Sequence, residues 1–188
     1  SDIKGFTVQT VSSDPAASVA SAGSWSSGAA LNQARRNSGS MGGASLAVQV
    51  TGGTPLAGGY PGVDGKSEQY NGTSWTEVAD LNTGRTNTMG CGTQTAGLNS
   101  SGLTSPPTVT KTENEQWDGS SWTEVGDVNT GRWSAGEAGT STAAIFAAGS
   151  IYPPVSADTE LWNGSAWSET TNMNTARKYV SGMGIQTA

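Results

Sequence analysis

The stretch Tyr70-Asn71-Gly72-Thr73-Ser74-Trp75-Thr76-Glu77 is one of three similar copies in the chain, and these copies indicate the fold. The other copies begin at Trp117 and Trp162, with Asp-Gly and Asn-Gly in the place of Asn71-Gly72. Asn-Gly or Asp-Gly between two short runs with aromatic residues is typical of a tight β-hairpin, whose two turn residues both need positive φ. The stretch therefore predicts adjacent antiparallel strands at residues 68–70 and 75–78, with equivalents in the other copies.

An arginine follows a tryptophan by ten residues in four places. These pairs are Trp25 and Arg35, Trp75 and Arg85, Trp122 and Arg132, and Trp167 and Arg177. Where the chain is long enough, a glycine follows the arginine by seventeen residues, at Gly52, Gly102 and Gly149. All variation in repeat length then falls in the stretches 53–66, 103–112 and 150–158, which are rich in Gly, Pro and Ser and are expected to be loops.

Two further short runs follow each arginine, such as 89–93 with 96–100 and 135–139 with 143–148. Four short strands in a repeat of about 47 residues describe one blade of a β-propeller. Helical periodicity is absent, and the 27 glycines oppose helices. The sequence thus predicts an all-β chain, one domain over 1–188. Its expected parts are N-terminal closing strands at 1–24 and repeat units at 25–67, 68–114, 115–159 and 160–188.

The repeat resembles the kelch motif, in which a double glycine ends the second strand, a Glu stands two residues before an aromatic residue, and a Trp opens the fourth strand. Gly52-Gly53, Glu68-x-Tyr70 and Trp75 match this pattern in one copy. The next two copies keep the Glu-x-Trp and the later Trp, and have Ser101-Gly102 and Gly149-Ser150 at the double glycine. The resemblance implies a kelch-like β-propeller.

A narrower resemblance is to the kelch-like proteins of marine and cyanobacterial phages. Repeats of the form Asp-Gly-x-Ser-Trp-Thr-Glu, Leu-Asn-Thr-Gly-Arg and Gly-x-Gly-Thr-Gln-Thr-Ala, and the opening run 5–15, are similar to those proteins. The resemblance implies a virion component associated with a tail or fibre.

The repeats suggest about four four-stranded blades, with the last blade split between the chain ends. The fourth repeat contributes a first strand at about 180–186, and the missing strands are expected from 4–11 and 17–22. Pairing the two ends would remove exposed sheet edges. The alternative is that chains exchange their ends and form a homo-oligomer, either a larger ring or a fibre.

Composition excludes several functions. The formal charge is −6 and the chain has no histidine, so nucleic acid is not an expected partner, and no apolar run is long enough to insert into a membrane. The single cysteine, Cys91, allows neither an internal disulfide nor a zinc site of the usual type. Ser-His-Asp and Cys-His catalysis lack their base. No catalytic residue, metal or cofactor is predicted.

The candidate binding face carries the inter-blade connections and the variable loops, which antiparallel strands place together. Its residues are Arg35, Arg85, Arg132, Arg177, Trp133, Tyr60, Asp64, Tyr152 and Asp158. Because the arginines recur at fixed spacing, they bind either scaffold carbonyls and glutamates or an anionic ligand on the axis. Trp133 stands where other copies have Thr86 and Lys178, and is the best aromatic candidate for stacking on a sugar.

The remaining repeated tryptophans are expected to form the structural core between blades. They are Trp25, Trp75, Trp122 and Trp167. Trp117 and Trp162 stand where Tyr70 stands in the first copy.

We expect a non-enzymatic phage virion protein, on a tail fibre or the capsid surface, with other virion proteins and a host surface glycan or protein as partners. A secreted lectin-like bacterial propeller and a protein-interaction kelch scaffold are the alternatives.

Overall fold

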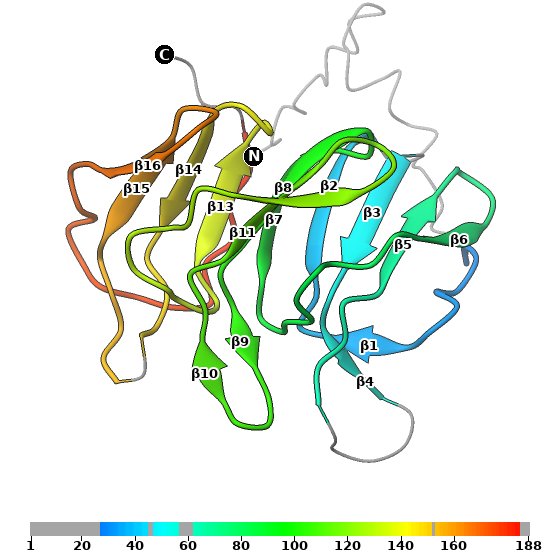
Figure 1. Ribbon diagram of the computed structural model, residues 1–188, viewed down its shortest axis with the longest axis horizontal. Helices are drawn as coiled ribbons and strands as arrows, with labels where there is room; N and C mark the ends of the chain where they lie inside the picture. Colours follow the sequence, from blue (N-terminus) through cyan, green and yellow to red (C-terminus); the bar gives the residue numbers. More distant parts are fainter. Residues whose placement is uncertain (1–26, 45–46, 57–61, 152, 185–188) are drawn as a thin grey trace, which may run out of the picture.

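The computed structural model describes residues 27–44, 47–56, 62–151 and 153–184, drawn in colour in Figure 1. These ranges contain sixteen β-strands and no helix, which confirms the prediction of an all-β chain. Every pair of neighbouring strands in the described sheets is antiparallel.

Twelve strands form three four-stranded sheets. The first contains β2 (Gly39–Ala44), β3 (Ala47–Thr51), β5 (Ser67–Tyr70) and β6 (Trp75–Val78). The second contains β7 (Met89–Thr93), β8 (Ala96–Ser100), β11 (Asn114–Trp117) and β12 (Trp122–Val125). The third contains β13 (Gly136–Gly139), β14 (Ala144–Ala147), β15 (Thr159–Trp162) and β16 (Trp167–Glu169). Within each sheet the strands lie in chain order, so each sheet straddles a boundary between two expected repeat units.

The predicted hairpin strands are confirmed, but the turn differs from the prediction. Tyr70 lies opposite Trp75 across β5 and β6, as expected. Of the two expected turn residues, Gly72 alone has positive φ, at 93°. The side-chain Oδ1 of Asn71 instead accepts hydrogen bonds from the backbone N–H groups of Thr73 and Ser74, each at 2.9 Å. Asn71 therefore forms an Asx turn, and Asp118 and Asn163 do the same in the other copies.

The variable stretches are loops with short strands of their own. β1 (Arg35–Arg36) pairs with β4 (Thr54–Pro55) in the first stretch, and β9 (Leu103–Thr104) pairs with β10 (Val109–Thr110) in the second. Isolated bridges join Thr86 to Leu103 and Trp133 to Ser150. Each inter-sheet connection is thus bonded to a variable loop. Both lie at the lower edge of Figure 1, opposite the turns of the β5–β6 and β15–β16 hairpins.

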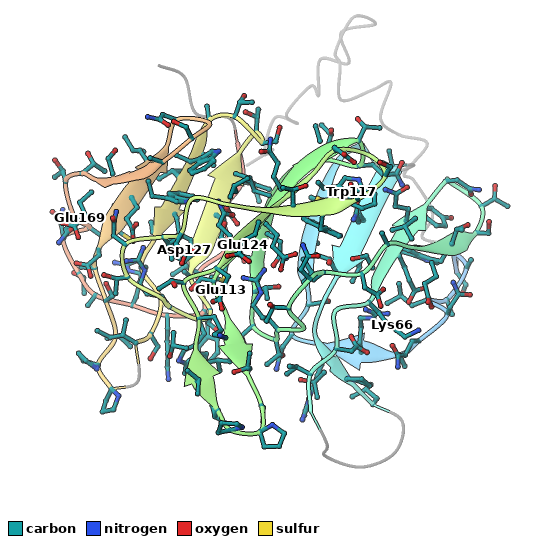
Figure 2. All side chains as sticks on the ribbon, in the orientation of Figure 1. Lys66, Glu113, Trp117, Glu124, Asp127 and Glu169 are labelled. Carbon is teal, nitrogen blue, oxygen red and sulfur yellow. The ribbon has the colours of Figure 1, made fainter. Side chains whose placement is uncertain are left out.

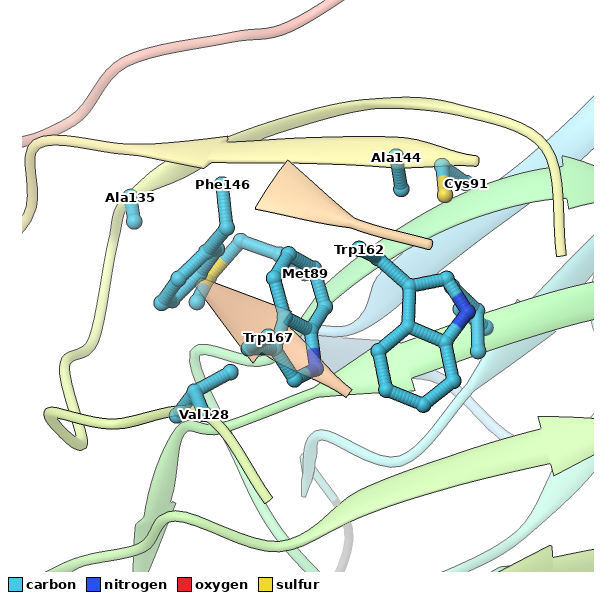
Figure 3. Packing of buried hydrophobic residues seen from close by; sticks show 9 residues of the cluster. Met89, Cys91, Val128, Ala135, Ala144, Phe146, Trp162 and Trp167 are labelled. Carbon is cyan, nitrogen blue, oxygen red and sulfur yellow. The ribbon is translucent and has the colours of Figure 1, made fainter. Parts of the chain in front are cut away.

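Apolar side chains fill the spaces between adjacent sheets. Trp117, labelled in Figure 2, packs with Met41, Leu81 and Trp122 between the first and second sheets. A larger cluster lies between the second and third sheets, where Trp162 and Trp167 pack with Met89, Cys91, Leu98 and Phe146 (Figure 3). The strands β2, β7 and β13 that begin the sheets lie next to each other, with β7 in the middle.

Two of the four repeated tryptophans lie in the core that the repeat predicts. Trp122 and Trp167 are buried between sheets, and Trp75 is partly buried against Tyr70 at a ring distance of 5.1 Å. Trp117 and Trp162, the residues that replace Tyr70, are also buried in the core, with 1% of each side chain exposed. Trp25 lies outside the described residues.

A β-bulge changes the glycine alignment of the first repeat. The pairing of β2 with β3 shifts register between Gly42 and Ala44, which adds one residue to the first repeat. Gly53, Gly102 and Gly149 are consequently equivalent, since each donates its N–H to the carbonyl of the next repeated arginine. The double glycine of the third repeat therefore corresponds to Ala148-Gly149, where Ala148 has a φ of 63°. The spacing of seventeen residues instead predicts Gly52 as the equivalent of Gly102, and Gly149-Ser150 as the counterpart of the double glycine. Both predictions are wrong by one residue.

The strand expected at 180–186 is absent over its described part, 180–184. The chain there still runs beside β13, where a Cβ on Gly136 would lie 3.1 Å from the Val180 side chain. The expected closing strands at 1–24 lie outside the described residues.

Candidate functional site

Three of the repeated arginines are buried in ion pairs. Arg35 Nη2 lies 2.8 Å from Glu68, Arg85 Nη2 lies 2.8 Å from Glu115, and Arg132 Nη1 lies 3.0 Å from Glu160. The three arginine side chains are not exposed to solvent. Arg35 and Arg85 also donate to backbone carbonyls.

This burial removes three arginines from the candidate binding face. Each guanidinium contacts the carboxylate two residues before the aromatic residue of the third strand, which is the scaffold arrangement expected as one alternative. Burial lowers the pKa of Arg85 and Arg132, an effect opposed by Glu115 and Glu160. A guanidinium with no exposed surface is not accessible to a ligand. Arg177 is different, because its side chain is exposed and has no ion pair among the described residues.

Trp133 lies beside Lys178 and Tyr179 on the face of the connections and loops. The Trp133 backbone exchanges hydrogen bonds of 3.0 and 2.9 Å with Ser150, which fixes its position at the loop base. The rings of Trp133 and Tyr179 meet edge to face at 6.0 Å. Lys178 Nζ lies 5.0 Å from the Trp133 ring centroid and 5.2 Å from that of Tyr179, within the range of cation–π attraction.

A cleft of about 460 Å³ opens between Trp133 and the β9–β10 hairpin. Leu103, Thr108 and Thr110 form its other wall. The indole Nε1 of Trp133 has no hydrogen-bond partner among the described residues, although it is buried from solvent. Because this nitrogen is closed to solvent, a ligand oxygen could reach it only if the Trp133 side chain turned. The cleft thus presents an aromatic residue and two threonine hydroxyls.

The acidic candidates lie near the buried arginines. Asp64 is 3.7 Å from Arg35, and burial raises its pKa. Asp158 is 3.9 Å from Arg132 and accepts a hydrogen bond from Asn172 Nδ2 at 3.1 Å. Both carboxylates therefore neutralise scaffold arginines. Tyr60 and Tyr152 lie outside the described residues.

Glu137 was not predicted as a site residue, and it lies in a cavity between the innermost strands. The cavity measures about 380 Å³, and its walls include Met41, Cys91 and Gly182. Glu137 Oε1 accepts a hydrogen bond from Ser100 Oγ at 2.8 Å, while Oε2 is buried without a partner in the described chain. Burial raises the pKa of Glu137 to about 7. A sequence signal existed, because the equivalent repeat positions hold Ser40, Gly90 and Gly182.

Four equivalent residues lie in the connections between sheets, at the ends of the molecule's innermost strands. Asn37, Asn87, Ser134 and Tyr179 each follow a repeated arginine by two residues and have φ between 52° and 59°. The N–H of Asn87 donates to Asn37 O, that of Ser134 to Asn87 O, and that of Tyr179 to Ser134 O. Successive connections are thereby joined backbone to backbone.

No group of three or more His, Cys, Asp or Glu side chains in the described ranges is placed to hold a metal ion. Nor does that part of the chain include a helix that could cross a membrane.

No known family model matches the sequence, and no curated protein is significantly similar to it. Among solved structures, the chain is similar to YjhT, with a TM-score of 0.62 and 11% identity. The similarity covers 77% of this chain and 54% of YjhT, so this chain spans about half the length of that protein. At this identity the similarity concerns the fold alone. YjhT is a kelch-type propeller, and the antiparallel sheets of this chain are consistent with a propeller-like fold or a β-sandwich.

Proposed function

We propose that the protein is a non-enzymatic binding module of a phage virion, carried on a tail fibre or the capsid surface, that binds a host surface glycan at Trp133. The observation that carries the proposal is the half-buried Trp133 at a cleft, with Lys178 and Tyr179 beside it. The phage assignment rests on the resemblance of the repeats to kelch-like phage proteins.

The architecture we propose is a four-bladed kelch-like propeller. The three sheets are three blades, and the two ends of the chain assemble the fourth. The succession of hydrogen bonds from Asn37 through Asn87 and Ser134 to Tyr179 supports four positions around one axis. Exchange of chain ends between copies is the competing arrangement, and sedimentation at several concentrations separates the two.

A glycan suits the chemistry of the cleft. An indole offers an apolar ring face to the C–H groups of a sugar. Thr108 and Thr110 supply hydroxyls on the opposite wall, which can donate and accept. Pockets that combine a flat apolar surface with a few convergent polar groups are typical of small-ligand sites.

The arrangement of carboxylates supports a binding role over hydrolysis. A glycosidase needs two carboxyl groups flanking one bond. Here Glu68, Glu115 and Glu160 are each paired with an arginine of the scaffold. Glu77, Glu124 and Glu169 are exposed on the outer strands, one on each sheet.

The binding test uses the purified chain on a glycan array, followed by titration of the best glycan. Trp133→Ala should weaken binding at least tenfold, about 1.4 kcal/mol, with an unchanged circular dichroism spectrum. Val109→Ala, at the exposed edge of the β9–β10 hairpin, is the matched control and should bind normally. Equal affinity of Trp133→Ala and the parent protein would remove the cleft from the proposal.

The location test is immunogold electron microscopy of particles from the source culture with antibody against this chain. Label at fibre tips supports an adhesin, and label over the head supports a capsid-surface protein. Unlabelled particles with soluble extracellular antigen would favour the secreted lectin. A specific cytosolic partner in a pull-down would favour the kelch scaffold.

A further inference from the structure

Each buried arginine belongs to a socket that holds one glutamate carboxylate. In the second repeat, Glu115 accepts hydrogen bonds from the backbone N–H groups of Asn82 and Thr83 at 2.7 and 3.3 Å, from Asn82 Nδ2 at 3.0 Å and from Arg85 at 2.8 Å. Asn82 Nδ2 also donates to the carbonyl of Trp122 at 3.0 Å. The socket therefore binds both strands of a hairpin, one through its Glu and the other through a Trp carbonyl.

The first and third repeats build the same socket. Asn32 and Gln33 hold Glu68 in the first repeat, with Trp75 O bonded to Asn32. Asn129 and Thr130 hold Glu160 in the third, with Trp167 O bonded to Asn129. Three independent copies of one donor set thus bind the same ligand group.

A fourth socket is formed by Asn174, Thr175 and Arg177, and its backbone is held in the same way. Met173 N donates to Ala157 O at 2.9 Å, as Leu81 N donates to Gly65 O at 2.8 Å. Arg177 Nε donates to Thr175 O at 3.4 Å, as Arg85 Nε donates to Thr83 O at 3.3 Å.

The downstream contacts of the fourth connection match as well. Arg177 O accepts from Gly149 N at 2.8 Å, as Arg132 O accepts from Gly102 N at 3.0 Å. Tyr179 has the positive φ of its equivalents. The fourth connection is therefore already in the conformation that binds a carboxylate.

The donors of the fourth socket are exposed and without a carboxylate. Asn174, Thr175 and Arg177 are all exposed, and within the described chain none of their donors toward the ligand position has a partner. The sequence contains no glutamate in 1–26, 45–46, 57–61, 152 or 185–188. None of those segments can therefore supply a glutamate to the position that Glu68, Glu115 and Glu160 occupy in the filled sockets.

We infer that the Asn174–Thr175–Arg177 socket binds a β-hairpin from outside residues 1–188, with a Glu two residues before an aromatic residue on one strand and a Trp opening the next. The chemistry of the three filled sockets identifies this partner, because they bind that pair of strands and no other group. A free sugar acid would satisfy the arginine and the backbone N–H groups but would leave the Trp carbonyl position unfilled. The inference does not depend on the glycan cleft. It competes with closure of the fourth blade by residues 1–24, because both arrangements place strands at the same socket.

The test is a titration of a cyclised peptide with the sequence of residues 159–169, Thr-Glu-Leu-Trp-Asn-Gly-Ser-Ala-Trp-Ser-Glu, into the ¹⁵N-labelled chain. Cyclisation is needed because an isolated hairpin is marginally stable in water. We expect saturable shifts of the Asn174 and Thr175 amides. Arg177→Gln should weaken binding at least tenfold, and a peptide with Gln in the place of Glu160 should lose it to the same extent.

Two controls make the result specific. Lys66→Gln removes one positive charge just before β5 of the first sheet, at a position labelled in Figure 2, and should leave the peptide affinity unchanged. Trp133→Ala should also leave it unchanged, which separates failure of this inference from failure of the glycan proposal. Equal binding of the Glu and Gln peptides, or no shift at millimolar peptide, would overturn the inference. Tighter binding of glucuronate or a sialic acid than of the peptide would overturn the polypeptide as partner.

Discussion

At the scale of single residues, the same side chain has opposite environments in different repeats. Arg85 is fully buried against Glu115, whereas Arg177 occupies the equivalent position and is exposed. Removing one partner of a buried ion pair leaves a charge in a poorly solvated place, which is far more costly than removing a surface charge. The two arginines therefore offer a matched pair of substitutions.

Arg85→Ala should lower the free energy of unfolding by about 3–5 kcal/mol, because Glu115 would remain buried without its cation. Arg177→Ala should change it by less than about 0.5 kcal/mol, as for other surface positions. Urea denaturation followed by tryptophan fluorescence measures both. Similar losses for the two variants would contradict the assignment of Arg85 to the scaffold.

Burial outweighs the one hydrogen bond that Glu137 accepts. Ser100 Oγ donates to Glu137 Oε1 at 2.8 Å, but Asn114 Oδ1 lies 2.9 Å from the same hydroxyl and competes for its single hydrogen. Burial raises the pKa of Glu137 to about 7, against smaller opposing effects of Ser100, Cys91 and Arg85.

Stability should fall as pH rises through the pKa of Glu137. The folded chain binds this proton more tightly than the unfolded chain, whose Glu titrates near 4.5. The stabilisation is therefore complete below about pH 4.5 and is lost by pH 8, with an upper limit of about 3 kcal/mol. Thermal unfolding of the parent and Glu137→Gln chains from pH 5 to 8 tests this. The exposed Glu124→Gln is the control, and a pH slope in Glu137→Gln as steep as the parent's would refute the assignment.

At the scale of elements, the glycine after each second strand is required by both backbone angle and space. Gly102 has a φ of 105°, and a Cβ there would lie 2.8 Å from Thr86 O. Gly43 in β2 has no such φ, and the nearest atom to its added Cβ is 4.0 Å away. An alanine should therefore lower the free energy of unfolding more at Gly102 than at Gly43.

Gly102→Ala should destabilise the chain by at least about 1–2 kcal/mol, because an L-residue is strained at this φ and the carbonyl of Thr86 must move. Gly43→Ala should have little effect. Differential scanning calorimetry of the two variants measures the contrast. An unchanged Tm in Gly102→Ala would show that the turn rearranges freely.

The twelve sheet strands could be predicted from the sequence, since repeated aromatic runs and turn residues mark them. The register shift between β2 and β3 could not be predicted. The extra residue in the first repeat lies in β2, where the pairing with β3 shifts register between Gly42 and Ala44, and the residue spacing alone does not reveal it. The β9–β10 hairpin pairs only two residues on each strand, too few for a periodic pattern.

At the scale of the whole molecule, the second sheet is the most enclosed. Its first strand β7 contacts both β2 and β13, and apolar clusters cover both of its faces. In β8, the side chains of Leu98, Asn99 and Ser100 have no exposed surface. Opening this sheet therefore requires separation from both neighbours.

Amide hydrogen exchange should be slowest in β8 and fastest among the sheet strands in β6 and β16. Local opening of an outer strand breaks few buried contacts, whereas opening of β8 approaches global unfolding. Exchange followed by mass spectrometry at peptide resolution checks the order. Protection of β6 equal to that of β8 would mean that the outer strands are covered by a further element.

The candidate site was partly predictable from the sequence, because Trp133 departs from the residues at its repeat position. Lys178 and Tyr179 were missed as ligand contacts, since only the fold brings residues 45 and 46 positions further along the chain beside Trp133. The role of the repeated arginines could not be predicted, because their fixed spacing is compatible with both a scaffold role and a ligand-binding role. Burial against Glu68, Glu115 and Glu160 assigns three of them to the scaffold.

The Arg–Glu socket also bears on how such a chain can evolve. Each filled socket takes its arginine, its amide donors and its glutamate from within about 35 consecutive residues. A duplication or deletion of one repeat length therefore adds or removes all of these residues together. Unequal recombination between the similar hairpin segments of the repeats would therefore change the number of sheets without leaving a buried charge unmatched inside any of them. Only the Asn174–Thr175–Arg177 socket would gain or lose a glutamate partner, because it is the socket that no glutamate of this chain fills.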